Sequence, residues 1–285
     1  MTAFNEALVE EAALDWFRGL QYDTAHGPEL APGEPNSERA LWSDVVLQDR
    51  LKRVISELNP SIPADAQDEA LKKVLNPETP SLIGNNRRFH AMLRDGVEVE
   101  YKRPDGTIAG DRVRLIDFTD LSKSDWLVVN QFRVKEGQHD RRPDVVVFIN
   151  GLPLAVIELK NAVNEETTIW SAINQLQTYK QEIGTLFHYN ALLVVSDGSN
   201  ARVGSLTATP EWFKVWRTID GESDAPKGTP ELEVLVKGVF NKRRFLDLLQ
   251  HFMACLKTRP ISFASQTNPP SKHWVLQQKF STHLR

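Results

Sequence analysis

The chain has 285 residues, of which 41% are hydrophobic and 25% charged, and its formal net charge at pH 7 is -4. This composition is typical of a globular protein with a sizeable core, and it excludes a disordered or fibrous chain. The mild acidity excludes a general polyanion binder, so any contact with nucleic acid must come from a local basic patch.

Cysteine content and the amino terminus indicate the compartment. The single cysteine, Cys255, excludes a disulfide within the chain and fits a reducing environment. The first residues, MTAFNEALVEEAALDWF, carry acids where a secretory signal needs bases, and no apolar run has the length of a membrane span. We therefore expect a cytoplasmic protein without a membrane partner.

The first third of the chain has the period of α-helices. Apolar residues recur on one face between residues 5 and 20, and a loop rich in Pro and Gly follows. Further helices are predicted over residues 39–58, 65–75 and 86–93. Pro60 and Pro63 end the first of these three.

From Val97 the period changes to two, which predicts β-strands. The expected strands cover residues 97–101, 112–118, 126–134, 145–149, 154–160, 191–197, 201–206 and 211–218. Helical spacing interrupts them at residues 166–182. The pattern predicts an α/β fold with a central mixed sheet flanked by helices.

A polar loop at residues 219–231 separates this region from a second helical pattern at 231–257. The chain closes with HWVLQQKFSTHLR, which has the pattern of another helix beginning. We therefore expect one domain over residues 1–218, and a loop with a small helical extension over 219–285.

The segment RRPDVVVFINGLPLAVIELKN, residues 141–161, carries charged residues at both ends of a hairpin of apolar and β-branched residues. Buried strands rarely tolerate charge unless something is bound there. Because side chains alternate across a strand, Glu158 and Lys160 lie on the same face.

The register of the hairpin decides where Asp144 lies. A strict two-residue turn at Asn-Gly would put Asp144 opposite Ile157, on the wrong face. A three-residue loop or one bulged residue brings it to the side of Glu158. Pro153 cannot donate to a strand ladder, so we expect an irregular hairpin.

Two carboxylates and an ammonium group on one face predict a magnesium site that hydrolyses phosphodiesters. A divalent cation relieves the repulsion between Asp144 and Glu158, and Mg²⁺ binds one or two carboxylates together with waters and substrate phosphate. Lys160 would orient the attacking water or stabilise the transition state, and the Leu159 carbonyl is a further candidate ligand. A surface hairpin with an ordinary Glu–Lys pair is the alternative explanation.

A second pair of polar residues lies on the helix that follows. Gln175 and Tyr179 are four residues apart in AINQLQTYK and therefore share a helix face. This helix can pack beside the hairpin, where both side chains offer donors to a phosphate or to a metal ligand. A buried tyrosine with a neighbouring glutamine is the alternative.

Taken together, PD at 143–144, ELK at 158–160 and QxxxY at 175–179 resemble the PD-(D/E)xK nuclease superfamily. The longer segments RRPDVVVFINGLPLAVIELKNAV, INQLQTYK and LFHYNALLVVSDGSNARVGSL resemble the amino-terminal nuclease domain of the type I restriction enzyme R subunit. VRLIDFTD and VNQFRV match the part of that family that precedes the motif. The resemblance covers about residues 5 to 255.

The resemblance implies a restriction-endonuclease-like fold and assigns roles to individual residues. Asp144, Glu158 and Lys160 match the metal-binding and catalytic residues of the family, whereas Gln175 and Tyr179 match residues that support cleavage or DNA contact.

An acid on the first helix often supports the site in this superfamily. Glu10 shares a helix face with Leu14 and Phe17, so we select it over Glu11 as a further metal ligand; a solvated helix edge is the alternative. Arg141 and Arg142 are candidate DNA-phosphate contacts.

The function implied is that of a type I site-specific deoxyribonuclease, with Mg²⁺, or Mn²⁺ in its place, as the cofactor. Residues 1–285 contain no G-x-x-x-x-G-K-[ST] loop, so ATP is expected to act only through a motor domain outside this chain. The implied partners are DNA and the methylation (M) and specificity (S) subunits. The rival hypothesis is a non-cleaving DNA-binding or coupling module that docks the motor and the methyltransferase core, and the intact triad argues against it.

Overall fold

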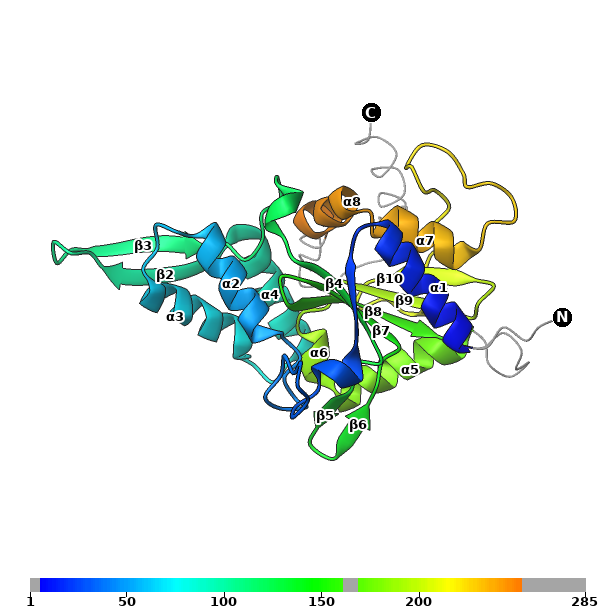
Figure 1. The fold of residues 1–285 in the computed structure, drawn as a ribbon, viewed down its shortest axis with the longest axis horizontal. Coiled ribbons are helices and arrows are strands. Elements are labelled where there is room, and N and C mark those ends of the chain that lie inside the picture. The colour runs from blue at the N-terminus through cyan, green and yellow to red at the C-terminus, as the bar shows by residue number, and fades with distance from the viewer. Residues whose placement is uncertain (1–5, 161–168, 253–285) are drawn as a thin grey trace, which may run out of the picture.

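A computed structural model of the chain describes residues 6–160 and 169–252, and Figure 1 shows a central sheet between helical layers with a long arm at one side. In chain order the elements are α1 (Glu6–Gly19), β1 (Asp23–His26), η1 (Gly27–Leu30), α2 (Gln48–Leu58), α3 (Ala64–Leu75), α4 (Leu82–Asp95), β2 (Val97–Lys102), β3 (Ile108–Val113), η2 (Leu121–Lys123), β4 (Trp126–Asn130), β5 (Val134–Glu136), β6 (His139–Arg141), β7 (Val145–Ile149), β8 (Leu152–Leu159), α5 (Ile169–Glu182), α6 (Gly184–Phe187), β9 (Leu192–Ser196), β10 (Ala201–Gly204), η3 (Pro210–Trp212), α7 (Glu231–Val239), α8 (Lys242–Asp247) and the π-helical turn η4 (Leu248–Phe252).

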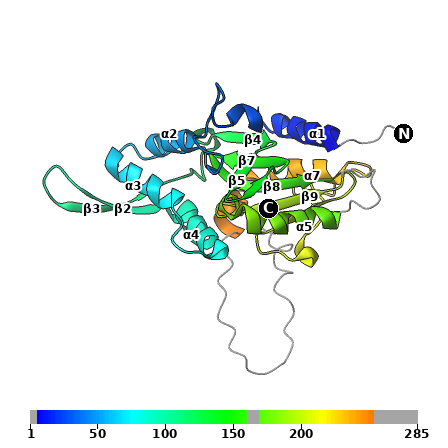
Figure 2. The ribbon, with the colours of Figure 1, turned by 90° about the horizontal axis from the view of Figure 1, so that it is seen from below.

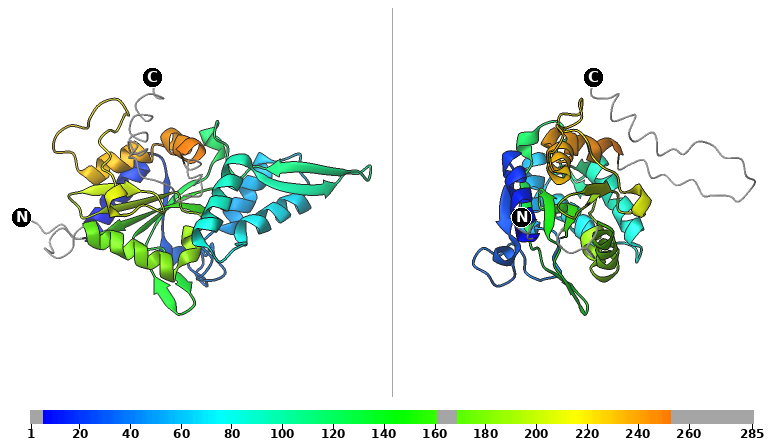
Figure 3. Two further views of the ribbon diagram at one scale, coloured as in Figure 1. Left: turned by 180° about the vertical axis from the view of Figure 1, so that it is seen from behind. Right: turned by 90° about the vertical axis from the view of Figure 1, so that its right-hand side faces the viewer.

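The central sheet contains six strands in the order β1-β4-β7-β8-β9-β10. Two neighbouring pairs, β1 with β4 and β8 with β9, are parallel, and the other three are antiparallel. The predicted α/β fold with a mixed sheet is therefore confirmed. Every residue of β7 and β8 is buried, because α1 and α7 cover one face of the sheet and α5 covers the other (Figures 1 and 3).

Several predicted elements differ from the observed ones. The helix expected over residues 39–58 begins only at Gln48, because the segment before it is irregular and bonds to strands instead: the Lys135 N–H donates to the Trp42 carbonyl at 3.1 Å. Strand β1 was not predicted, since it lies in the Pro- and Gly-rich loop and is held by distant β4.

Two expected strands were wrong over most of their length. The one at 112–118 ends at Val113, where β3 stops pairing with β2. The one at 211–218 forms only a single bridge, between Lys214 and Val203.

The turn between β7 and β8 is a two-residue Asn-Gly turn, so of the two options that the sequence left open, a bulge and not a three-residue loop makes the hairpin irregular. Asn150 and Gly151 have φ angles of 56° and 78°, as a type I′ turn requires. The buried Asn150 side chain donates to the Leu115 carbonyl at 2.9 Å and accepts from the Asp125 N–H at 2.8 Å. A Cβ on Gly151 would lie 2.4 Å from the Leu47 carbonyl oxygen, so only glycine fits at this position.

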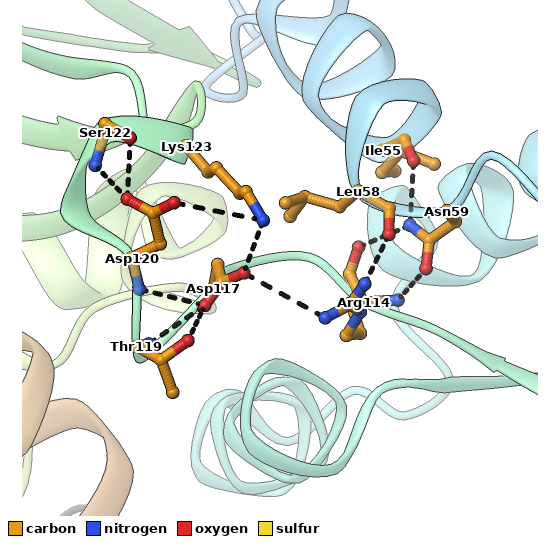
Figure 4. Close-up of polar contacts among 9 residues, drawn as sticks. All are labelled: Ile55, Leu58, Asn59, Arg114, Asp117, Thr119, Asp120, Ser122 and Lys123. Carbon is orange, nitrogen blue, oxygen red and sulfur yellow. Dashed lines mark hydrogen bonds and ion pairs between the residues drawn. The ribbon is translucent and has the colours of Figure 1, made fainter.

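An arm built from α2, α3, α4 and the β2–β3 hairpin projects from the sheet (Figures 1 and 2). Polar contacts stabilise the loop that joins the arm to β4 (Figure 4). Arg114 donates to the Leu58 carbonyl at 2.7 Å, and the Asp117 carboxylate accepts from the hydroxyl and N–H of Thr119 at 2.6 and 2.9 Å. The hydrogen bond from the Thr119 hydroxyl is the main reason that the pKa of Asp117 falls to about 2. These contacts fix the direction in which the arm leaves the sheet.

The described part of the carboxyl-terminal extension packs onto the sheet domain. The Tyr22 hydroxyl donates to the Phe240 carbonyl at 2.9 Å, and Arg243 donates to the carbonyls of Phe118 and Thr119 at 2.8 Å each. Apolar residues between Leu232 and Leu249 also belong to the core of the sheet domain, and the boundary at residue 218 stays a prediction.

Cys255, the last residues of the helix predicted over 231–257 and the final predicted helix lie outside the described residues. Across residues 6–160 and 169–252, none of the helices combines the length and apolarity needed to cross a lipid bilayer.

We predict that Gly151→Ala destabilises the protein by roughly 3 kcal/mol, because the new methyl group meets the Leu47 carbonyl and the residue must also keep a positive φ. Gly33→Ala is the matched control: Gly33 has a φ of 89° but open space around it, so we expect a loss of about 1 kcal/mol. Urea unfolding of both variants measures the difference, and equal losses would contradict the close approach.

Candidate active site

One extra residue in β8 sets the geometry of the site. Phe148 pairs with Pro153, but the next pair is Val147 with Ala155, so Leu154 is a bulge. From there the register runs to Val145 opposite Ile157, which puts Asp144 one step beyond, beside Glu158. The prediction of an irregular hairpin is confirmed.

Asp144, Glu158 and Lys160 lie together at the end of the hairpin. The two acids are 7% and 0% exposed, and one Asp144 oxygen, Oδ2, accepts from the Leu159 N–H at 2.7 Å. Lys160 Nζ donates to Glu158 Oε1 at 2.7 Å, and its side chain is only 14% exposed. The Lys160 backbone is held in turn, because its N–H donates to the Ser196 carbonyl at 2.8 Å. The sequence therefore brings two buried carboxylates and an ammonium group into one site; their catalytic roles stay predictions.

Gln175 and Tyr179 face this site from α5. The Gln175 amide donates to the Tyr179 hydroxyl oxygen, which leaves the phenolic proton available for donation. Burial, and next the negative charges of Glu158 and Asp144, raise the pKa of Tyr179 well above its usual value. The phenol thus stays protonated at neutral pH, with a proton free to donate near both carboxylates.

Glu10 reaches the same region from α1, but two amides hold its carboxylate. Asn130 Nδ2 donates to Glu10 Oε1 at 2.7 Å, and Gln131 Nε2 donates to Glu10 Oε2. Within the described ranges 6–160 and 169–252, no three His, Cys, Asp or Glu side chains are arranged to hold a metal ion. The oxygen donors that the hairpin offers a cation are the carboxylates of Asp144 and Glu158 and the Leu159 carbonyl, a set that suits Mg²⁺ with its waters. Glu10 as a further metal ligand stays a prediction.

The structural role of Gln131 was not predicted from the sequence, although the VNQFRV motif that contains this residue was recognised. The Gln131 N–H donates to the Asp144 carbonyl at 2.8 Å while its side chain binds Glu10, so Gln131 links α1 to Asp144, which directly precedes β7. It adopts a φ of 56°, which is uncommon for a residue other than glycine, and Gly27 packs against its carbonyl so closely that a Cβ would lie 2.4 Å away. No local sequence pattern predicts this backbone conformation.

The two arginines before Asp144 have different surroundings. Arg141 pairs with Glu182 at the end of α5, with Nη2 at 2.9 Å from Oε1. Arg142 is exposed. As DNA contacts, both remain predictions.

Comparison with known proteins identifies the family. A family model described as the type I restriction enzyme R protein N terminus matches residues 3–212. The chain belongs to this family. The resemblance noted in the sequence is thereby confirmed.

Two curated relatives agree with this R protein family. The HindI endonuclease subunit of Haemophilus influenzae is 34% identical over 252 residues, covering 87% of this chain and 24% of the relative. The putative MjaIXP endonuclease subunit of Methanocaldococcus jannaschii is 33% identical over 265 residues, covering 86% of this chain and 25% of the relative. The chain thus spans about a quarter of the length of either type I restriction enzyme subunit.

We predict that Gln131→Glu destabilises this R protein domain by about 2 kcal/mol, because a charge-assisted hydrogen bond is replaced by two facing carboxylates. Adding Glu10→Gln should restore most of this loss, since the amide–carboxylate pair forms again with donor and acceptor exchanged, and Asn130 keeps an acceptor. Urea unfolding of the two single variants and the double variant gives the coupling energy. Additive effects would show that the two side chains do not interact.

Proposed function

We propose that this chain is the Mg²⁺-dependent endodeoxyribonuclease module of a type I restriction enzyme R subunit, hydrolysing DNA phosphodiester bonds. The observation that carries the proposal is the buried pair of Asp144 and Glu158 beside Lys160, in a chain of the R protein family.

Electrostatics favour a bound cation. Two acidic side chains and one lysine share a site where both acids are at least 93% covered. Charge at such depth is costly unless it is paired or coordinates a metal. Asp144, Glu158 and the Leu159 carbonyl would hold Mg²⁺, and Mn²⁺ fits the same oxygen ligands. When bound, the ion supplies a Lewis acid for the phosphate and lowers the pKa of a bound water.

The protein's own groups would position the reacting atoms. Lys160, fixed by its bond to Glu158, is close enough to the carboxylates to orient the attacking water and to stabilise negative charge on the phosphorane. Tyr179, with its hydroxyl oxygen already accepting from Gln175, would donate its proton to a phosphate oxygen. The burial of the acids excludes bulk water, which strengthens each of these interactions.

The proposal includes the assembly in which such a module acts. DNA would be delivered by an ATP-driven motor in the remainder of the R subunit, and the M and S subunits would supply methylation and site recognition. The net charge of -4 agrees with delivery of DNA by other parts of the complex.

Plasmid nicking tests the proposal. We expect the wild-type chain to nick supercoiled DNA with Mg²⁺ or Mn²⁺ and to be inactive in EDTA. Lys160→Ala should lower the rate by at least about 100-fold, in the range found when a group that stabilises transition-state charge is removed. Lys237→Ala is the control, since Lys237 on α7 is also ion-paired, with Glu233, but lies on another element.

Equal nicking by wild type and Lys160→Ala would refute the role of Lys160, and nicking that persists in EDTA would refute the metal. A wild-type chain that does not cut with either ion would favour the non-cleaving coupling module.

A further inference from the structure

The β5–β6 hairpin lies immediately before Asp144 in the chain and projects from the sheet domain beside α5 and α6 (Figure 1). Its register pairs Val134 with Arg141, Lys135 with Asp140 and Glu136 with His139. Because side chains alternate, the hairpin has two faces of different composition. One face carries Val134, Glu136, His139 and Arg141, and the other carries Arg133, Lys135, Asp140 and Arg142.

The first face is docked on the body of the protein. Arg141 and His139 both contact Glu182 at the end of α5, the latter at 3.5 Å. Glu136 accepts from the Thr185 N–H at 3.0 Å. These contacts fix the hairpin and turn its second face away from α5 and α6.

The second face, which we call the basic hairpin face, carries three cations and one carboxylate. The side chains of Arg133 and Lys135 are 47% and 43% exposed, and both use Asp140, at 2.7 Å from Arg133 Nε and 3.6 Å from Lys135 Nζ. Arg142 is exposed, and within the described part of the chain no carboxylate lies within ion-pair distance of it. The face therefore has excess positive charge on a chain whose net charge is -4.

Trp42 restricts the side-chain conformations of Arg133 and Lys135. Its carbonyl accepts from the Lys135 N–H, and its ring centroid lies 5.3 Å from both the Arg133 guanidinium and Lys135 Nζ. Contacts of this kind hold long side chains over the ring, so less rotamer freedom is lost when a ligand binds.

The basic hairpin face is adjacent to the candidate site along the chain. Arg142 is two residues before Asp144, and an extended chain advances about 3.3 Å per residue, so the two Cα atoms are within roughly 7 Å. Neighbouring phosphates on a DNA strand are separated by a similar distance. A strand whose scissile phosphate lies at Asp144 would therefore have a neighbouring phosphate within reach of the long Arg142 side chain, with Arg133 and Lys135 farther along the same face of the hairpin.

We propose that the basic hairpin face binds the backbone phosphates of duplex DNA next to the bond cut at Asp144, with Asp140 limiting its affinity. The inference rests on the proposed function of the site but depends on different residues. It assigns the phosphate contact to Arg142 rather than to Arg141, whose guanidinium is bound to Glu182. Contacts to phosphates carry no sequence information, which suits a nuclease module that receives its DNA from other parts of a complex.

Fluorescence anisotropy of a labelled 30-base-pair duplex, measured in EDTA, tests this without cleavage. We expect Lys135→Gln combined with Arg142→Gln to weaken binding at least tenfold at low salt. The slope of log K against log salt should fall by about 1.8, because two phosphate contacts are lost. Asp140→Asn should act in the opposite direction and tighten binding several-fold, since it releases Arg133 and Lys135.

The matched control is Lys102→Gln combined with Arg103→Gln, which removes the same charge from exposed positions at the tip of the arm. We expect its affinity to stay within about twofold of wild type. Equal weakening by both double variants, weaker binding by Asp140→Asn, or no binding of DNA by the wild-type chain would overturn the proposal.

The two proposals fail separately in these assays. If no protein nicks DNA but the hairpin variants still lose binding, the catalytic assignment fails and the phosphate-binding face stands. If wild type nicks DNA and the hairpin variants bind and nick equally well, the face is refuted and the catalytic assignment stands.

Discussion

The bulge at Leu154 is the local feature on which the candidate site depends. Without it, the Asn-Gly turn would align Asp144 with Ile157, and the carboxylate would point into an apolar layer. Pro153 has no N–H to continue the ladder with β7, and on the β9 side of β8 the Leu154 carbonyl accepts from the Ala191 N–H at 2.7 Å. A register shift of one residue moves a side chain to the opposite face of a sheet. Here the shift puts two acids that are 14 positions apart on the same face.

The sheet around this bulge determines what kind of chemistry the site can perform. Strand β8 lies between β7 and β9, so Glu158 is fully buried although it is charged. Helix α5 brings a protonated tyrosine from one side, and Gln131 ties Glu10 of α1 to the backbone of Asp144. Groups held in this way lose little freedom when substrate binds, which is the usual basis of electrostatic catalysis.

Much of this arrangement could be predicted from the sequence because its signals are local. The Asn-Gly pair predicts a turn with positive φ, the alternation around Glu158 and Lys160 assigns their common face, and Pro153 predicts an irregular ladder. The residue that bulges could not be predicted, because a three-residue loop and one bulged residue would both bring Asp144 to the side of Glu158.

Other features depend on distant partners in the same way. Strand β1 forms because it pairs with β4, and this pairing cannot be predicted from a segment rich in Pro and Gly. The role of Gln131 depends on contacts with Glu10, Gly27 and Asp144, which lie in three other segments of the chain. The segment EWFKVWRT alternates like a strand, yet only Lys214 pairs with the sheet, and Phe213 is buried in the core.

The central claim is that the bulged hairpin presents Asp144 and Glu158 to a shared cation. Anomalous diffraction from crystals equilibrated with Mn²⁺ tests it most directly. The account predicts one strong peak within about 2.3 Å of a carboxylate oxygen of both residues. A peak bound to only one of them, or saturating Mn²⁺ that leaves no peak near either, would contradict it.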